Sequence, residues 1–130
     1  MRPAARLQSA IELLDAIIVA ARDGGASADQ IASRFFAARR YAGSKDRRAV
    51  RDLVWNAIRR FGERPLNARS AFVAMAASDP EIAALFDGSD HGPHPIEATE
   101  RRAVEGALPS WLLPHLSPTL DESELGALLE

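Results

Sequence analysis

The sequence predicts an all-α protein, a bundle of six to eight helices. Apolar residues recur at spacings of three and four in successive segments, the pattern of amphipathic helices, and glycine or proline separates the segments. No segment alternates apolar and polar residues as a half-buried strand would. The 130 residues are 47% hydrophobic and 26% charged, a globular composition that can bury a core.

The first two helices are expected near the start of the chain. Residues Arg6–Arg22 carry one apolar stripe, and a glycine pair ends it. Ser27 and Gln30 match a capping box, in which each side chain accepts a hydrogen bond from the other residue's backbone N–H. The second helix should therefore follow Ser27 and end near Arg39.

The third helix is the longest expected element. It should run from Ser44, as its N-cap, to about Phe61, where glycine and then proline prevent its continuation. A fourth helix is expected at 67–77. Asp79 followed by Pro80 predicts the N-cap and first residue of a short fifth helix.

The rest of the chain predicts a loop and further helical segments. Glycine and proline make 88–95 the strongest loop, and 96–107 should be helical. Ser110 should cap a short helical turn, and a last helix should begin near 121. That helix has no terminating glycine, so we expect the natural chain to continue beyond Glu130.

The charge is unevenly distributed along the chain. Residues 1–69 carry 14 Arg and Lys against 7 Asp and Glu, or +7, and residues 70–130 carry 2 against 11, or −9, which sum to −2. A basic half of this kind favours a polyanion such as a nucleic acid, and the acidic half would suit a basic partner. The alternative is that the charged side chains bind no partner and only contact water or form salt bridges with one another.

The third helix should have two different faces. One carries the apolar residues that would build the bundle: Val50, Leu53, Val54, Ala57 and Phe61. The other carries Arg48, Arg51, Trp55 and Arg59. Arginine matches phosphate with a planar fork and an aromatic ring can stack on an unpaired base, so this ridge is typical of RNA-binding surfaces. Two alternatives remain: Trp55 packs against another helix, or the arginines pair with Asp15, Asp46 or Asp52.

Several kinds of chemistry lack residues in this sequence. There is no cysteine, which excludes a disulfide, a catalytic thiolate and a cysteine-based zinc site. His91, His94 and His115 lack accompanying ligands, so we expect no metal site. No catalytic triad spacing or glycine-rich phosphate loop occurs. Without a signal peptide or a long apolar run, we expect a cytoplasmic protein with no membrane partner.

Two segments resemble a known family. The stretch from Ser44 to Arg60, SKDRRAVRDLVWNAIRR, resembles a helix of the NusB-like fold, which occurs in the antitermination factor NusB and in the RsmB (Fmu, Sun) group of RNA cytosine-C5 methyltransferases. The stretch LPSWLLPHL, 108–116, resembles the segment that follows the NusB-like domain in those methyltransferases. The resemblance implies a NusB-like RNA-binding domain at 1–107 and the start of a connector at 108–130.

The resemblance also implies where catalysis would occur. The methyltransferases bind S-adenosylmethionine on a Rossmann-like domain and use cysteine thiolates, none of which this chain contains. The catalytic domain should therefore lie beyond residue 130, with no catalytic, cofactor or metal site here. By the same resemblance, the NusB-like part helps to hold ribosomal RNA. The expected phosphate contacts are Arg39, Arg40, Lys45, Arg47, Arg48, Arg51, Arg59 and Arg60, with Trp55 as a possible stacking residue.

Three functions follow in order of preference. The first is an RNA-binding accessory domain of an rRNA methyltransferase. The second is a NusB-like adaptor that binds protein, including the catalytic domain of its own chain. A stand-alone enzyme is the weakest, since the sequence supplies no site for it.

Overall fold

The computed structural model describes residues 1–61 and 67–103. They form five α-helices, which are α1 (Pro3–Arg22), α2 (Ala28–Ala37), α3 (Ser44–Arg60), α4 (Ala68–Ala76) and α5 (Pro80–Ala84). The described residues contain no strand, so the all-α prediction is confirmed for them. The helices expected near Ser110 and 121 lie outside the described residues, and a total of six to eight stays a prediction.

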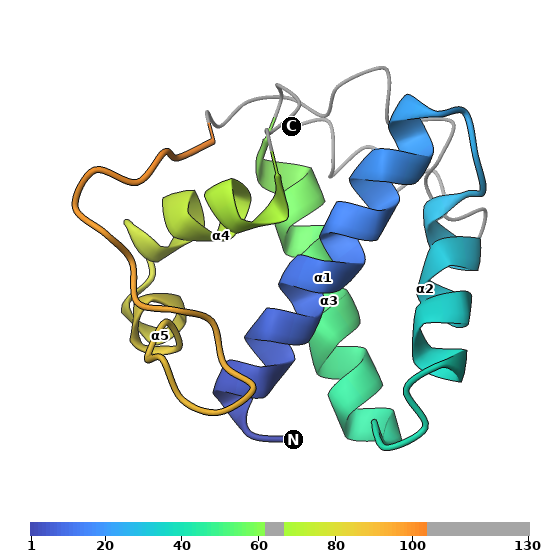
Figure 1. The fold of residues 1–130 in the computed structure, drawn as a ribbon, viewed down its shortest axis with the longest axis horizontal. Coiled ribbons are helices and arrows are strands. Elements are labelled where there is room, and N and C mark those ends of the chain that lie inside the picture. The colour runs from blue at the N-terminus through green and yellow to red at the C-terminus, as the bar shows by residue number, and fades with distance from the viewer. Residues whose placement is uncertain (62–66, 104–130) are drawn as a thin grey trace.

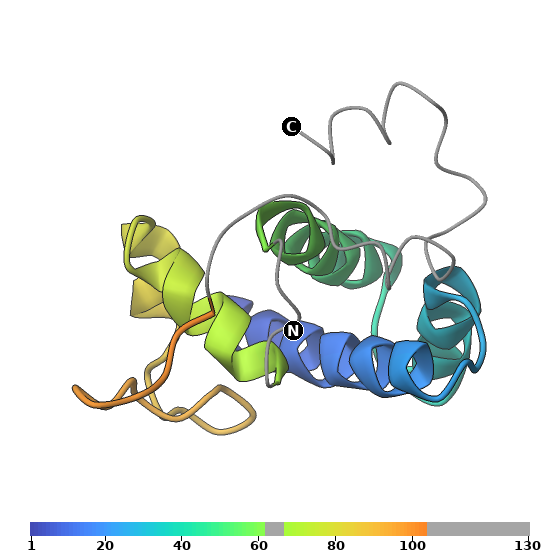
Figure 2. The same cartoon turned by 90° about the horizontal axis from the view of Figure 1, so that it is seen from above.

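Helix α1 is the centre of the arrangement. It packs against α2, α3 and α4, and α5 packs against α4 (Figure 1). Figure 2 shows α3 in a separate layer above α1. The side of α3 that faces away from α1 is not covered by another of the five helices. Arg48 and Arg59, the first and last residues of the predicted arginine ridge, are exposed on this helix.

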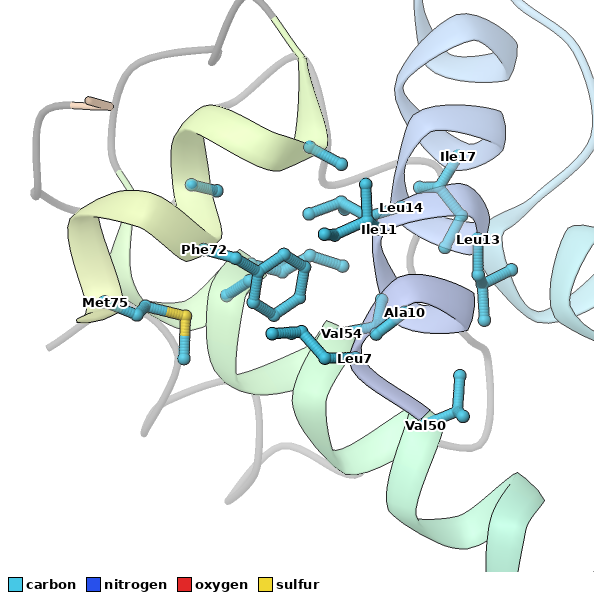
Figure 3. Packing of buried hydrophobic residues seen from close by; sticks show 14 of the residues in the cluster. Leu7, Ala10, Ile11, Leu13, Leu14, Ile17, Val50, Val54, Phe72 and Met75 are labelled. Atoms are coloured by element: carbon cyan, nitrogen blue, oxygen red, sulfur yellow. The ribbon is translucent and has the colours of Figure 1, made fainter. Parts of the chain in front are cut away.

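The core lies where α1, α3 and α4 meet (Figure 3). Leu7 of α1, Val50 and Val54 of α3 and Phe72 of α4 are at most 1% exposed. The apolar face predicted for α3 is confirmed, because Val50, Val54, Ala57 and Phe61 are buried and Leu53 packs against them. Phe72 is the largest of the fully buried side chains and fills the space between the three helices.

We predict that Phe72→Ala lowers the free energy of unfolding by about 4 kcal/mol, because it removes a ring from a fully buried site and leaves a cavity. Denaturant unfolding followed by circular dichroism measures the change. The control is Val19→Ala in α1, whose side chain is 53% exposed and whose truncation should cost within about 0.5 kcal/mol. Equal losses in the two variants would contradict this assignment of the core.

The helix termini confirm some sequence predictions and correct others. The capping box before α2 is present, with both the Gln30 N–H to Ser27 Oγ and the Ser27 N–H to Gln30 Oε1 distances at 3.2 Å. Asp79 caps α5 as expected. Helix α1 begins at Pro3 rather than Arg6, since proline is well tolerated in the first turn, and α2 ends at Ala37.

The prediction that Ser44 is the N-cap of α3 is wrong. Gly43 is the N-cap and Ser44 is the first helical residue. The side chain of Asp46 accepts a hydrogen bond from the Gly43 N–H at 3.2 Å. A carboxylate in the first turn of α3 thus satisfies a backbone donor that a Ser44 cap would have left to water.

The helix predicted at 96–107 is also absent over the described part, 96–103. Its backbone is irregular there, and the Ala103 N–H donates to the Ser70 carbonyl at 3.1 Å, which ties the segment to α4. Residues 104–107 lie outside the described part. The stretch has only a weak amphipathic pattern, so its preference for a helix was smaller than the stabilisation from its contacts with Arg69.

Arg69 of α4 holds this segment through several groups at once. Its guanidinium donates through Nε and NH2 to the two carboxylate oxygens of Glu100, with the NH2–Oε1 distance 3.0 Å. NH2 also bonds the carbonyls of His94 and Pro95, at 2.9 and 3.1 Å. The guanidinium carbon is 5.1 Å from the centre of the Phe86 ring. The hydrogen bond from Arg69 is the main cause that lowers the pKa of Glu100 below its usual 4.5.

We predict that Glu100→Gln raises the exchange rate of the Ala103 amide, because the neutral side chain holds Arg69 less strongly and frees the segment from α4. Hydrogen exchange by NMR, expressed as protection factors, measures this. Acid should act in the same way: the contribution of Glu100 is complete above pH 4.5, its value without the pair, and is lost as pH falls through the lower folded pKa.

The matched control is Glu97→Gln, which removes the same charge three residues away from an exposed side chain. Its carboxylate takes no part in the Arg69 contacts. If both variants change the Ala103 protection factor equally, net charge rather than the Arg69 pair holds the segment.

Candidate nucleic-acid interface

The position of α3 is determined at its first turn by Asp46. Arg6 of α1 donates to Asp46 Oδ1 through Nε and NH2, both at 2.9 Å, and the Gly43 N–H bonds Oδ2. The amino group of Met1 lies 3.4 Å from Oδ1. Asp46 is only 9% exposed, and the hydrogen bond from Arg6 is the main cause that lowers its pKa below 3.8. This cluster joins the starts of α1 and α3.

We predict that Asp46→Asn lowers the melting temperature, because the neutral amide loses the charge-assisted bonds with Arg6. The folded pKa of Asp46 is depressed, so its contribution is complete above pH 3.8 and is lost as pH falls through that lower pKa. Thermal unfolding of parent and variant over a pH series should therefore show a difference near neutrality that shrinks in acid.

Asp52→Asn is the control, because Asp52 is an exposed carboxylate on the same helix with no ion pair among the described residues. Its effect should be small at every pH. A difference for Asp46→Asn that does not change with pH would show that shape rather than charge is what matters at this position.

Three of the predicted RNA-contacting arginines make contacts within the fold, with α2, the turn that follows it or α1. Arg39 lies over the Phe35 ring, 3.6 Å from its centre, and 3.6 Å from a carboxylate oxygen of Glu12. Arg47 Nε donates to the Ala42 carbonyl at 3.0 Å. Arg51 is 3.8 Å from Asp29 and 5.6 Å from the centre of the Phe36 ring. These guanidiniums are already engaged, two of them with carboxylates.

A fourth arginine connects the ends of two helices. Arg60, in the last turn of α3, donates to the Ser78 hydroxyl just after α4 at 3.0 Å. The alternative that the arginines pair with Asp15, Asp46 or Asp52 is therefore only partly correct. Arg51 does pair with a carboxylate, but it is Asp29 of α2, while Asp46 is taken by Arg6 and Asp15 accepts from the Ala68 N–H at 2.7 Å.

Four predicted cations remain exposed: Arg40, Lys45, Arg48 and Arg59. Among the described residues none of the four has a hydrogen bond, an ion pair or an aromatic contact. By helical periodicity Lys45, Arg48 and Arg59 lie on the side of α3 that faces away from the core. Arg48 and Arg59 are about 16 Å apart along the axis, so they can meet different phosphates of one strand. We call these four residues the basic surface.

The structure supports the alternative in which Trp55 packs within the bundle, and it exposes a different aromatic residue. Trp55 is partly buried and packs against the core, which leaves only part of its ring for a partner. Tyr41, beside Arg40 in the turn between α2 and α3, is 70% exposed. Tyr41 is not among the residues predicted from the sequence. Its position in Arg-Arg-Tyr, within a turn rather than on an apolar helix face, is the signal that could have identified it.

Metal and membrane sites find no support in the part of the chain that is described. No group of three or more histidine, aspartate or glutamate side chains is placed to hold a metal ion within 1–61 and 67–103. His91 and His94 are exposed, and His115 is outside those ranges. None of the described helices has the length and apolar character needed to cross a bilayer.

Comparison with known proteins gives no relative from which the function of this interface could be inferred. No protein-family model matches this chain, and no curated protein or solved structure shows significant similarity to it. The resemblance to NusB-like domains therefore stays a prediction from the two sequence segments. The exposed cations and the uncovered side of α3 are what the structure adds to it.

Proposed function

We propose that this chain is the RNA-binding accessory domain of an S-adenosylmethionine-dependent rRNA (cytosine-C5) methyltransferase that acts in the cytoplasm. The observation that carries RNA binding is the basic surface, where four cations reach solvent without a carboxylate partner among the described residues. An unpaired cation loses little on meeting a phosphate, whereas Arg39 or Arg51 would first have to give up an existing carboxylate contact.

Positive charge of this kind supports affinity more than sequence selection. Phosphate contacts release counterions, so binding weakens as salt is added and depends little on base identity. In the proposal, Arg40, Lys45, Arg48 and Arg59 contact phosphates directly. Arg39, Arg47, Arg51 and Arg60 position α2 and α3 beneath the RNA, through the contacts described above.

Methyl transfer belongs to another part of the protein in this proposal. The chain has no cysteine to attack a cytosine, and the described residues offer neither a strand edge nor a glycine-rich loop for S-adenosylmethionine. The cofactor and the catalytic cysteines would be supplied by a domain that follows residue 130. This domain would only hold the RNA and present it.

A protein-binding adaptor is the second candidate, and a different observation favours it. Exposed carboxylates follow one another on α5 and the segment after it, at Glu81, Asp87, Asp90 and Glu97. Such a surface would complement a basic protein, including the catalytic domain of the same chain. These carboxylates and the cations of α3 lie on different elements, so both roles can hold in one protein.

We predict that Arg48→Glu combined with Arg59→Glu weakens binding to a structured RNA by at least tenfold, because two exposed phosphate contacts become repulsive. Fluorescence anisotropy with a labelled rRNA hairpin over a salt series measures it. The parent should bind in the micromolar range, and the log-log salt slope should fall by roughly 1.5 in the variant.

The matched control is Arg101→Glu with Arg102→Glu. It makes the same change in net charge, from −2 to −6 as two positive residues become negative, at exposed positions in the acidic half. If the two double variants weaken binding equally, total charge rather than the basic surface is responsible. A parent without RNA affinity at low salt would favour the adaptor.

A further inference from the structure

A groove of about 760 Å³ opens at the start of α1, within the range of small-ligand sites. Its walls come from three places in the chain: the first turns of α1, Tyr41 of the turn before α3, and Asp90 and His91 of the loop after α5. In Figure 1 the chain's N-terminus lies between that loop and the α2–α3 turn. The groove thus lies between Tyr41 and the start of α1.

Polar groups that line the groove lack partners. Ser9 is only 6% exposed, yet its hydroxyl makes no hydrogen bond within the described residues. The Gln8 amide and the Tyr41 hydroxyl also have none there. Because a buried hydroxyl without a partner is costly, Ser9 marks a position where a ligand's polar atom would be favourable.

Tyr41 gives the groove an aromatic wall. Its ring is 70% exposed, so a face of the ring is open to a ligand in the groove. Aromatic rings of this kind stack on unpaired RNA bases. Polar side chains nearby can then form hydrogen bonds with the edges of the stacked base. Helical RNA keeps its bases paired, so Tyr41 could engage only a base that is turned outward.

The charges at the groove suit a nucleotide. Arg2 lines it and Arg40 precedes Tyr41 in the sequence, and both are exposed cations of the kind that bind phosphate. Two carboxylates also line it. Glu12 is held by Arg39 at 3.6 Å, which offsets its charge, and Asp90 lies at the outer loop. A carboxylate such as that of Glu12 accepts hydrogen bonds from a base edge, and an amide such as that of Gln8 both donates and accepts them.

We propose that this groove holds one unpaired nucleotide of the bound RNA, stacked on Tyr41. Gln8, Ser9 and Glu12 hydrogen-bond the edge of the base, and Arg40 and Arg2 hold its phosphates. This inference rests on the proposed function and adds to it a preference for RNA with an unpaired loop. The α3 cations supply affinity for any RNA, and the groove selects the single-stranded nucleotide.

The loop after α5 closes one side of the groove. A Cβ on Gly92 would lie 3.0 Å from the Cβ of Ala4 and closer still to Ser89 Oγ, so only glycine lets this loop approach α1 so closely. His91 has a φ of 66°, in the left-handed region that non-glycine residues seldom adopt. Both features hold Asp90 and His91 against the start of α1.

The test compares an RNA hairpin that has an unpaired loop with the fully paired duplex of its stem. Tyr41 is the only tyrosine in the chain, so one labelled ring signal reports on the groove in NMR spectra. The hairpin should shift this signal and the duplex should not. Tyr41→Leu should weaken hairpin binding about tenfold and leave duplex binding within about twofold.

Two further variants sharpen the test. Tyr41→Phe keeps the ring and should lose much less hairpin affinity than Tyr41→Leu. Val19→Ala removes part of another exposed apolar side chain, near the opposite end of α1, and should have no effect on either RNA. Circular dichroism checks that each variant folds, and the exposure of Tyr41 means that its replacement should not disturb the core.

The outcomes separate this inference from the proposed function. If hairpin and duplex bind equally, Tyr41→Leu has no effect, and the Arg48 and Arg59 variant still weakens binding at least tenfold, the proposed function holds and the groove inference is wrong. If the parent binds neither RNA, both are wrong. A ring signal that shifts only on adding a basic protein domain would assign the groove to protein binding.

Discussion

The ion pair between Arg6 and Asp46 is the constraint on which the basic surface depends. It joins the start of α1 to the start of α3 and, with the Gly43 N–H, occupies the buried carboxylate from both sides. Asp46 is 9% exposed, so its carboxylate would lose favourable bonds if the starts of the two helices moved apart. Once the first turn of α3 is held, helical geometry decides which of its side chains meet the core and which meet solvent.

The arginines of this chain serve two purposes that residue type alone does not separate. Arg39, Arg47 and Arg51 lie along α2, where phenylalanine rings and backbone or carboxylate oxygens receive them. Arg48 and Arg59 are on the same helix as Arg51 but are exposed and make no hydrogen bond, ion pair or ring contact among the described residues. Arginines that stabilise the bundle and arginines that are free to bind a polyanion therefore lie within a few residues of each other on α3.

The separation of charge along the sequence is carried into space by two elements. The basic half supplies α3 and the turn before it, whereas the acidic half supplies α5 and the loop that follows. Arg69 joins the halves, because it belongs to the basic part by sequence and binds Glu100 of the acidic part. The acidic segment is thus held beside α4, away from the exposed side of α3, where its carboxylates would otherwise compete with an RNA for the cations.

Local patterns in the sequence were sufficient for the five described helices, the capping box at Ser27 and the apolar face of α3, because each depends on residues within a turn or two of one another. They were not sufficient for the start of α3, for 96–103 or for the fate of each arginine. Those were decided by the pairs Arg6–Asp46 and Arg69–Glu100, which are 40 and 31 positions apart, and by the distances from Arg39 and Arg51 to α1 and α2. The sequence by itself determined that the chain is helical and that one half is basic. Only the tertiary structure decided which cations stay free and that Tyr41 faces solvent, because long-range partners compete for side chains whose chemistry is otherwise the same.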